Sequence, residues 1–276
     1  MNTALAFTLD PERLDELAAQ YSAGYSEAKP FPHVVIEDFL PEETLNEVLR
    51  EFPSPDDVDW GRFNNPTEKK LALSNETRIG SATRLLLYEL NSSTFVNFLE
   101  KLTGIDGLIP DPHFWGGGLH QIKRGGYLKV HADFNWYSKL RLDRRLNLLV
   151  YLNRDWKEEY GGHLELWDND MIRSEKRILP VFNRCVIFST TDYAHHGHPD
   201  PLNCPEHQTR KSFALYYYTN GRPSEETSPV HTTLFRRRPS EKIGASLYSF
   251  LTRLTPPIVI EAQHYLRKIR SRSKNR

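Results

Sequence analysis

His131-Ala132-Asp133 is the stretch around which the rest of the chain is organised. Residues two apart on an extended strand point to the same face, so this spacing places an imidazole beside a carboxylate. These groups are two of the three ligands in a two-histidine, one-carboxylate site, which leaves coordination positions of a non-haem Fe(II) open. The sequence therefore predicts a metal centre that needs one more histidine from a distant strand.

The cluster His195-His196-Gly197-His198 is the source of that histidine. On a strand His195 faces opposite to His196 and His198, so either of the last two could reach the metal. We predict His196 as the third ligand and keep His198 as the alternative. The unused histidines would orient the ligands or contact a substrate.

Arg210-Lys211-Ser212 opens a strand of aromatic residues that continues to Tyr218. Arg210 and Ser212 share one face of this strand, whereas Lys211 points to the other. A guanidinium is a rigid fork that binds a carboxylate through two hydrogen bonds, and a hydroxyl beside it adds another donor. Arg210 and Ser212 are therefore predicted to hold a carboxylate close to the metal.

Short β-rich runs separated by turn residues follow one another from about Phe114, and many short strands at this spacing indicate a barrel or sandwich. We expect strands at 119–123, 127–133, 146–152, 163–167, 185–190, 195–198 and 212–219. The preceding third has a short strand at 31–39 and helical periodicity at 10–24, 41–52, 82–90 and 93–102. Residues 56–77 show no usable period.

The composition is that of a soluble protein, with 38% hydrophobic and 26% charged residues among 276. No apolar run approaches the roughly 18 residues that a membrane span needs. Residues 1–7 lack the basic start of a signal peptide, and Cys185 and Cys204 form no disulfide framework. These observations predict a cytoplasmic protein.

Charge is uneven although the net charge is zero. From Arg236 onward there are eleven Lys and Arg residues against Glu241 and Glu261, so the preceding part carries about nine net negative charges. Two helices are expected there, at 241–254 and 258–269, separated by Pro256-Pro257. This basic tail would suit an anionic partner such as a membrane surface, an acidic glycan or a nucleic acid, or it packs on the acidic body of the same chain.

The region from about 117 to 222 resembles the prolyl-4-hydroxylase-like branch of the 2-oxoglutarate- and Fe(II)-dependent dioxygenases. The resemblance is carried by His131-Ala132-Asp133, Tyr151-Leu152-Asn153 with Trp156, Gly161-Gly162-His163-Leu164, Pro180-Val181-Phe182-Asn183-Arg184, His196-Gly197-His198-Pro199 and Arg210-Lys211-Ser212. Many prolyl hydroxylases have Tyr three residues before the first ligand. Here Leu128 takes that place and Tyr127 stands one residue earlier.

The resemblance implies an α+β chain with a mainly β core, a double-stranded β-helix of the jelly-roll or cupin-like type. Supporting helices would occupy 1–110, the oxygenase core 111–225 and the basic helical tail 226–276. By position His131, Asp133 and His196 match the iron ligands, Arg210 matches the anchor of the distal carboxylate of 2-oxoglutarate, and Tyr151 matches a further contact to that carboxylate.

The activity implied is hydroxylation with Fe(II), using 2-oxoglutarate and O2 as cosubstrates and releasing succinate and CO2. The substrate would be a small molecule, a glycan or a peptide, because no residue selects among them. Two rival functions remain at this stage. One is a cupin-like metal binder or isomerase, which needs no 2-oxoglutarate anchor, and the other is a non-catalytic interaction protein that uses its basic tail.

Overall fold

The computed structural model describes residues 7–241 of the chain. The chain divides into a unit of residues 1–238 and a unit of residues 239–276, and the description below concerns the first. Its helices are α1 (Pro11–Glu27), α2 (Glu42–Arg50), α3 (Ser81–Glu89) and α4 (Ser93–Thr103), with short 3-10 turns η1 (Glu76–Arg78), η2 (Glu158–Tyr160) and η3 (Ser224–Glu226).

Most of the described strands begin after residue 108. They are β1 (His33–Ile36), β2 (Gly61–Asn64), β3 (Glu68–Leu73), β4 (Ile109–Pro110), β5 (Gly118–Ile122), β6 (Tyr127–Ala132), β7 (Trp136–Tyr137), β8 (Leu142–Tyr151), β9 (Leu164–Trp167), β10 (Ser174–Ile178), β11 (Cys185–Ser189), β12 (His196–His198), β13 (Arg210–Thr219) and β14 (Leu234–Phe235).

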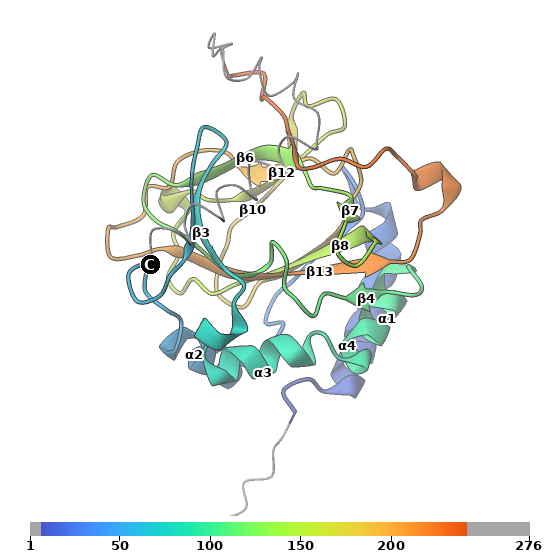
Figure 1. Cartoon of the computed structure of the whole chain (residues 1–276), viewed down its shortest axis with the longest axis horizontal. Coiled ribbons are helices and arrows are strands. Elements are labelled where there is room, and N and C mark those ends of the chain that lie inside the picture. The colour runs from blue at the N-terminus through green and yellow to red at the C-terminus, as the bar shows by residue number, and fades with distance from the viewer. Residues whose placement is uncertain (1–6, 242–276) are drawn as a thin grey trace, which may run out of the picture. The chain divides into compact units, whose positions relative to one another are not determined.

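The strands form one curled antiparallel sheet, a half-barrel. The main path runs β1-β11-β8-β13-β5-β3-β6-β12-β9-β10, with β2, β4, β7 and β14 attached at its sides. The sheet bends so that β6 and β12 lie across from β8 and β13 (Figure 1). Because side chains alternate along each strand, every strand sends one set toward the inside of this curl.

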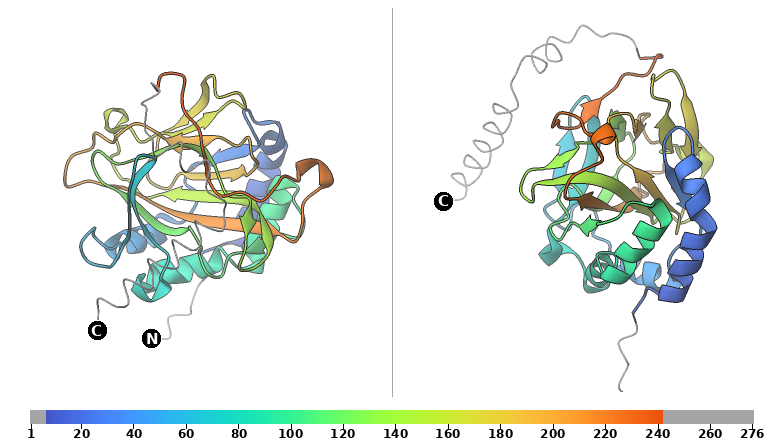
Figure 2. Two further views of the ribbon diagram at one scale, coloured as in Figure 1. Left: turned by 45° about the horizontal axis from the view of Figure 1, so that its top comes forward. Right: turned by 90° about the vertical axis from the view of Figure 1, so that its right-hand side faces the viewer.

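The N-terminal helices pack against the outer face of β8 and β13 (Figure 1). Helix α1 begins at Asp10, whose side chain accepts a hydrogen bond from the Glu12 amide, and Pro11 occupies its first turn. Helix α4 ends at Gly104, which adopts the left-handed conformation that favours glycine. Figure 2 shows α1 and α4 side by side. Their buried residues form one hydrophobic core with the sheet, which supports the strands from outside.

The helices and strands expected from periodicity are confirmed to within a few residues, apart from the tail helices, which lie outside the described residues. The sequence predicts no helix or strand in residues 56–77, but β2 and β3 lie there. All of β2 is exposed, and only Leu71 and Leu73 are buried on β3, so no apolar alternation is visible in the sequence. Strand β10 was missed for the same reason, since only Ile178 is buried.

No helix within residues 7–241 combines the length and the apolar character that a membrane crossing requires. The mainly antiparallel β core with N-terminal helices agrees with the expected fold class.

Candidate metal centre and cosubstrate pocket

Three predicted ligands meet inside the curl of the sheet. His131 on β6 and His196 on β12 are directly opposite each other in the antiparallel pair, and Asp133 follows the end of β6. The Nε2 atom of His131 lies 3.6 Å from Oδ1 of Asp133, and Nε2 of His196 lies 3.5 Å from Oδ2. One atom from each residue can be chosen so that all three lie within 4.8 Å of one another, so the group could hold a metal ion.

Hydrogen bonds fix the tautomers of both imidazoles. Nδ1 of His131 donates to the Lys129 carbonyl at 2.8 Å, and Nδ1 of His196 donates to the Ala194 carbonyl at 2.9 Å. The proton on each Nδ1 leaves the lone pair on Nε2, which faces Asp133. Burial, with His131 nearby, lowers the pKa of His196 to about 3. His196 is therefore neutral and able to bind a metal at ordinary pH.

Asp133 is held by two side chains from β8. Asn147 Nδ2 donates to Oδ2 of Asp133 at 2.6 Å, and Arg144 Nη2 lies 3.2 Å from the same oxygen. Arg144 also donates to Oδ1 of Asn147 through Nε and Nη2. Burial alone would raise the pKa of the Asp133 carboxyl, but Arg144 and the two histidines outweigh it, and the pKa lies well below its usual value. The carboxylate is ionised, as a metal ligand must be.

The role of Arg144 was missed by sequence reasoning. Strict alternation along β8 would place Arg145 on the face of Asn147, but the register with β13 shifts between Leu146 and Arg144. This irregularity turns Arg144 inward, where its guanidinium lies between the rings of Phe134 and Tyr216, 4.3 Å and 3.5 Å from their centroids.

Asn147 supplies the first prediction. Asn147→Ala removes the short bond to Asp133 and one anchor of Arg144, so we expect metal affinity to fall about 10- to 100-fold, as for other groups that orient ligands. Anaerobic Fe(II) titration measures the effect. Asn153→Ala is the control, because this buried amide bonds to the Pro180 and Lys211 carbonyls rather than to a ligand. Equal losses in both variants would mean that Asn147 stabilises only the fold.

Arg210 begins β13 and is 5% exposed. Its Nε donates to the Gly162 carbonyl at 2.9 Å, and its Nη2 lies 3.4 Å from the Tyr151 hydroxyl. Within residues 7–241 no carboxylate lies within 4.0 Å of this guanidinium. A buried cation without a counter-ion is costly. The site is therefore suited to a ligand that brings its own carboxylate.

The absence of a side chain at Gly162 leaves room for the Arg210 side chain. A Cβ atom at Gly162 would lie 3.0 Å from Cδ of Arg210 and 2.6 Å from a methyl group of Leu202, and its φ of +75° favours glycine.

Neighbouring strands carry further polar side chains along the same row as Arg210. Tyr151 on β8, Ser212 on β13 and His120 on β5 are register partners in turn, so their side chains share the inner face. Tyr151 and Ser212 are buried, and burial raises the pKa of Tyr151. The structure thus brings Arg210, Ser212 and Tyr151 together on the inner face; their role in binding a carboxylate stays a prediction.

The remaining histidines of the cluster separate. His195 faces away from the triad, with Nε2 3.3 Å from Nε of Arg236, whereas His198 is buried inside the curl. The side chain of Tyr127 serves the fold, because its hydroxyl donates a hydrogen bond to the Asn65 carbonyl on the β2–β3 connection.

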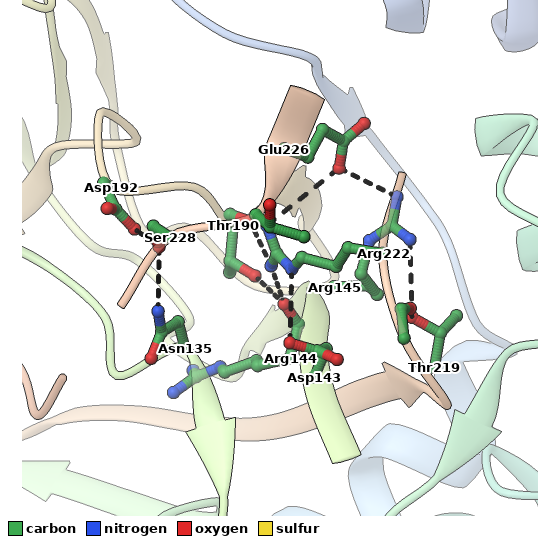
Figure 3. A network of polar contacts seen from close by, with 12 residues as sticks. Asn135, Asp143, Arg144, Arg145, Thr190, Asp192, Thr219, Arg222, Glu226 and Ser228 are labelled. Carbon is green, nitrogen blue, oxygen red and sulfur yellow. Dashed lines mark hydrogen bonds and ion pairs between the residues drawn. The ribbon is translucent and has the colours of Figure 1, made fainter. Parts of the chain in front are cut away.

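Residues 220–238, called the strap here, return from the end of β13 to the edge of β6 (Figure 1). Figure 3 shows part of its fastening, in which Arg145 Nη2 donates to Glu226 at 3.1 Å and Asn135 donates to Ser228 at 3.0 Å. Strand β14 then pairs with β6, and the Phe235 ring lies 5.5 Å from the His131 ring. The strap therefore lies against His131, the first of the three ligands. Arg145 serves this fastening, not the triad.

A curled antiparallel sheet with a two-histidine, one-carboxylate cluster and a buried arginine defines a class of metal-dependent oxygenases that take a carboxylate-bearing cosubstrate. Residues 117–218 match the 2OG-Fe(II) oxygenase superfamily, so this part of the chain, which holds the metal-ligand cluster and Arg210, is identified as a 2OG-Fe(II) oxygenase region. Its cofactor and cosubstrate are accordingly Fe(II) and 2-oxoglutarate. The imidazoles of His131 and His196, the ionised Asp133 and Arg210, which has no carboxylate partner within residues 7–241, fit both.

Solved structures with the same fold include prolyl hydroxylases. A prolyl-4-hydroxylase from Pseudomonas putida is 14% identical, with a TM-score of 0.50 over 76% of this chain and 99% of that one. A prolyl hydroxylase from Trichoplax adhaerens, solved with a hypoxia inducible factor peptide fragment, is 18% identical, with 0.50 over 75% and 91%. A prolyl 4-hydroxylase from Phytophthora capsici is 21% identical, with 0.50 over 78% and 67%.

Proposed function

We propose that this oxygenase is a hydroxylase in which His131, Asp133 and His196 hold Fe(II), while Arg210, Ser212 and Tyr151 hold the distal carboxylate of 2-oxoglutarate. Bound there, Fe(II) would supply the activation of O2, with 2-oxoglutarate as the two-electron reductant: one oxygen atom would enter the substrate as a hydroxyl group and the other would enter succinate as 2-oxoglutarate loses CO2. We further propose that the half-barrel is a double-stranded β-helix of the jelly-roll type.

The protein's own residues position the reactants and exclude water. Asn147 and Arg144 hold the Asp133 carboxylate in place, and the two Nδ1 hydrogen bonds hold the imidazole rings. Arg210, with Tyr151 beside it, neutralises the carboxylate that enters the buried pocket. Phe188 and Phe235 pack against the ligand histidines and shield the centre.

The observation that carries this proposal is that Arg210 is buried on the same inner face as the triad and has no carboxylate partner among residues 7–241. The test is to titrate 2-oxoglutarate into the anaerobic Fe(II) protein and to record the visible spectrum. We expect a metal-to-ligand charge-transfer band. A protein that binds Fe(II) but develops no such band would be a cupin-like metal binder or isomerase, and one that binds neither would be an interaction protein.

The substrate class is proposed from one of the structures with the same fold. The Trichoplax enzyme was solved with a peptide fragment, and we propose a peptide as the first class to test here, with small molecules and glycans as the alternatives. Substrate-stimulated succinate formation across peptide, amino-acid, nucleotide and glycan pools would identify it. Stimulation by a pool other than peptides would overturn the peptide proposal.

The basic tail lies outside the described residues beyond Glu241. We propose residues 1–110 as support, 111–225 as the catalytic core and 226–276 as a tail for an anionic partner in the cytoplasm. Within that range the strap residues 226–238 are fastened to the core, so the partner would bind the residues after them. Truncation after Ser240 is expected to leave Fe(II) and 2-oxoglutarate binding unchanged while association with anionic vesicles weakens. Added salt should weaken the same association in the full chain, because exposed charges more than about 8 Å apart are screened at physiological ionic strength. Salt-insensitive association in both proteins would overturn the proposal.

A further inference from the structure

His198 is buried inside the curl of the sheet without a hydrogen-bond partner. Its side chain is 4% exposed, and neither Nδ1 nor Nε2 contacts a donor or acceptor among residues 7–241. Leaving a polar group buried and unpaired destabilises the folded protein. An imidazole kept in this state therefore points to a ligand that it meets when the pocket is filled.

The strand pairing places His198 on the side of Arg210. Strand β12 pairs with β9 so that His196 faces Leu166 and Gly197 faces Glu165, and the Gly162 carbonyl just before β9 accepts a hydrogen bond from Arg210 Nε. His196 opposes His131, but His198 opposes Leu128, so two residues of β6 face the single residue Gly197. Glycine is required there, because a Cβ would lie 2.8 Å from the Leu128 carbonyl oxygen and 2.9 Å from that of Lys129. The close approach brings β12 onto β6 and directs His198 inward beside His196.

The groups around His198 indicate which ligand its imidazole can bind. Arg210, Lys70, His131 and His120 are the charged or titratable groups that act on it electrostatically. Lys70 is already paired with Glu68 at 3.2 Å, and His120 is bonded to the Gly116 carbonyl at 3.2 Å. Arg210 has no carboxylate partner within residues 7–241. The ligand carboxylate that Arg210 would receive therefore lies close to His198. A neutral imidazole carries one N–H and can donate one hydrogen bond to it.

We propose that His198 is a positioning residue that donates a hydrogen bond to the same distal carboxylate of 2-oxoglutarate that Arg210 holds. This inference rests on the proposed function. It assigns His198 a role in selecting a 2-oxo acid with a second carboxylate, separate from metal binding. It also explains why a histidine occupies this position although the metal centre already has its two imidazoles.

The test compares two 2-oxo acids binding to the anaerobic Fe(II) protein, followed by calorimetry and by the charge-transfer band. 2-Oxopentanoate has the chain length of 2-oxoglutarate but a methyl group in place of the distal carboxylate. For His198→Leu we expect the dissociation constant of 2-oxoglutarate to rise about 10- to 100-fold, the loss of one hydrogen bond to a charged group. Binding of 2-oxopentanoate and of Fe(II) should stay within about twofold of the wild type.

Two further variants separate positioning from packing. His198→Gln retains an N–H donor and should recover part of the lost 2-oxoglutarate affinity. His195→Leu is the matched control, since it removes a neighbouring buried histidine whose ring faces Arg236, and it should leave both acids unaffected.

The possible outcomes are distinct. Unchanged 2-oxoglutarate binding in His198→Leu, or equal losses for the two acids, would overturn the proposal while the oxygenase function stands. Loss of Fe(II) in His198→Leu would show that His198 is a metal ligand and would also overturn it. Failure of the wild-type protein to bind 2-oxoglutarate would overturn the proposed function and this inference together.

Discussion

Asp133→Asn is expected to remove metal binding and turnover together, because it takes the only carboxylate from the ligand cluster while preserving its shape. Loss of a direct ligand should lower metal affinity by more than the roughly 10- to 100-fold typical of groups behind the ligands. His131→Ala and His196→Ala should behave alike. Metal content after dialysis against a chelator, followed by succinate formation, measures both effects.

The alanine variant at position 133 is the less informative choice. Arg144 is 1% exposed at its side chain and lies 3.2 Å from Asp133, so removing the carboxylate strands a buried cation. Breaking such a pair costs about 3 to 5 kcal/mol, which would confuse unfolding with metal loss. His198→Leu is the control for the histidine variants and should retain Fe(II). Metal loss there, with metal retained in His196→Ala, would reverse the ligand assignment.

The metal centre was largely predictable because its information is local. The separation of His131 and Asp133 by one residue shows that they share a face, and His196 and Arg210 each open a short β-rich run. The alternation along those runs sufficed to place Arg210 and Ser212 on one face and Lys211 on the other.

The groups that hold the centre were less predictable, because they depend on irregular pairing. A shifted register in β8 exchanges the facing of Arg144 and Arg145, and the bulged pairing of β6 with β12 sets the position of His198. Gly197 is a sequence sign of the second irregularity, because glycine within a strand often marks a bulge, but no residue type marks the shift in β8. Likewise, no apolar pattern in residues 223–238 indicates that Leu234 and Phe235 pair with β6, since that pairing joins segments about 100 residues apart.

Arg210→Ala is expected to weaken 2-oxoglutarate binding steeply while Fe(II) binding persists. Deleting one partner of a guanidinium–carboxylate contact in a buried pocket costs on the order of 2 to 4 kcal/mol, which corresponds to about 30- to 1000-fold in affinity. The dependence of succinate formation on 2-oxoglutarate concentration measures it, supported by the charge-transfer titration. Lys211→Ala is the matched control, because Lys211 is adjacent but lies on the opposite face of β13.

The direction in which the midpoint of thermal unfolding changes in Arg210→Ala distinguishes an arginine that binds the cosubstrate from one that stabilises the fold. Arg210 is buried, has no carboxylate partner within residues 7–241, and burial lowers its pKa, so the ligand-free protein bears the cost of this charge. The midpoint of thermal unfolding without 2-oxoglutarate should therefore stay the same or rise in Arg210→Ala. Added 2-oxoglutarate should raise the midpoint of the wild type but not of the variant, since a ligand stabilises only the protein that binds it. A marked fall in the ligand-free midpoint, with unchanged dependence on 2-oxoglutarate, would show that Arg210 supports the fold and not the cosubstrate.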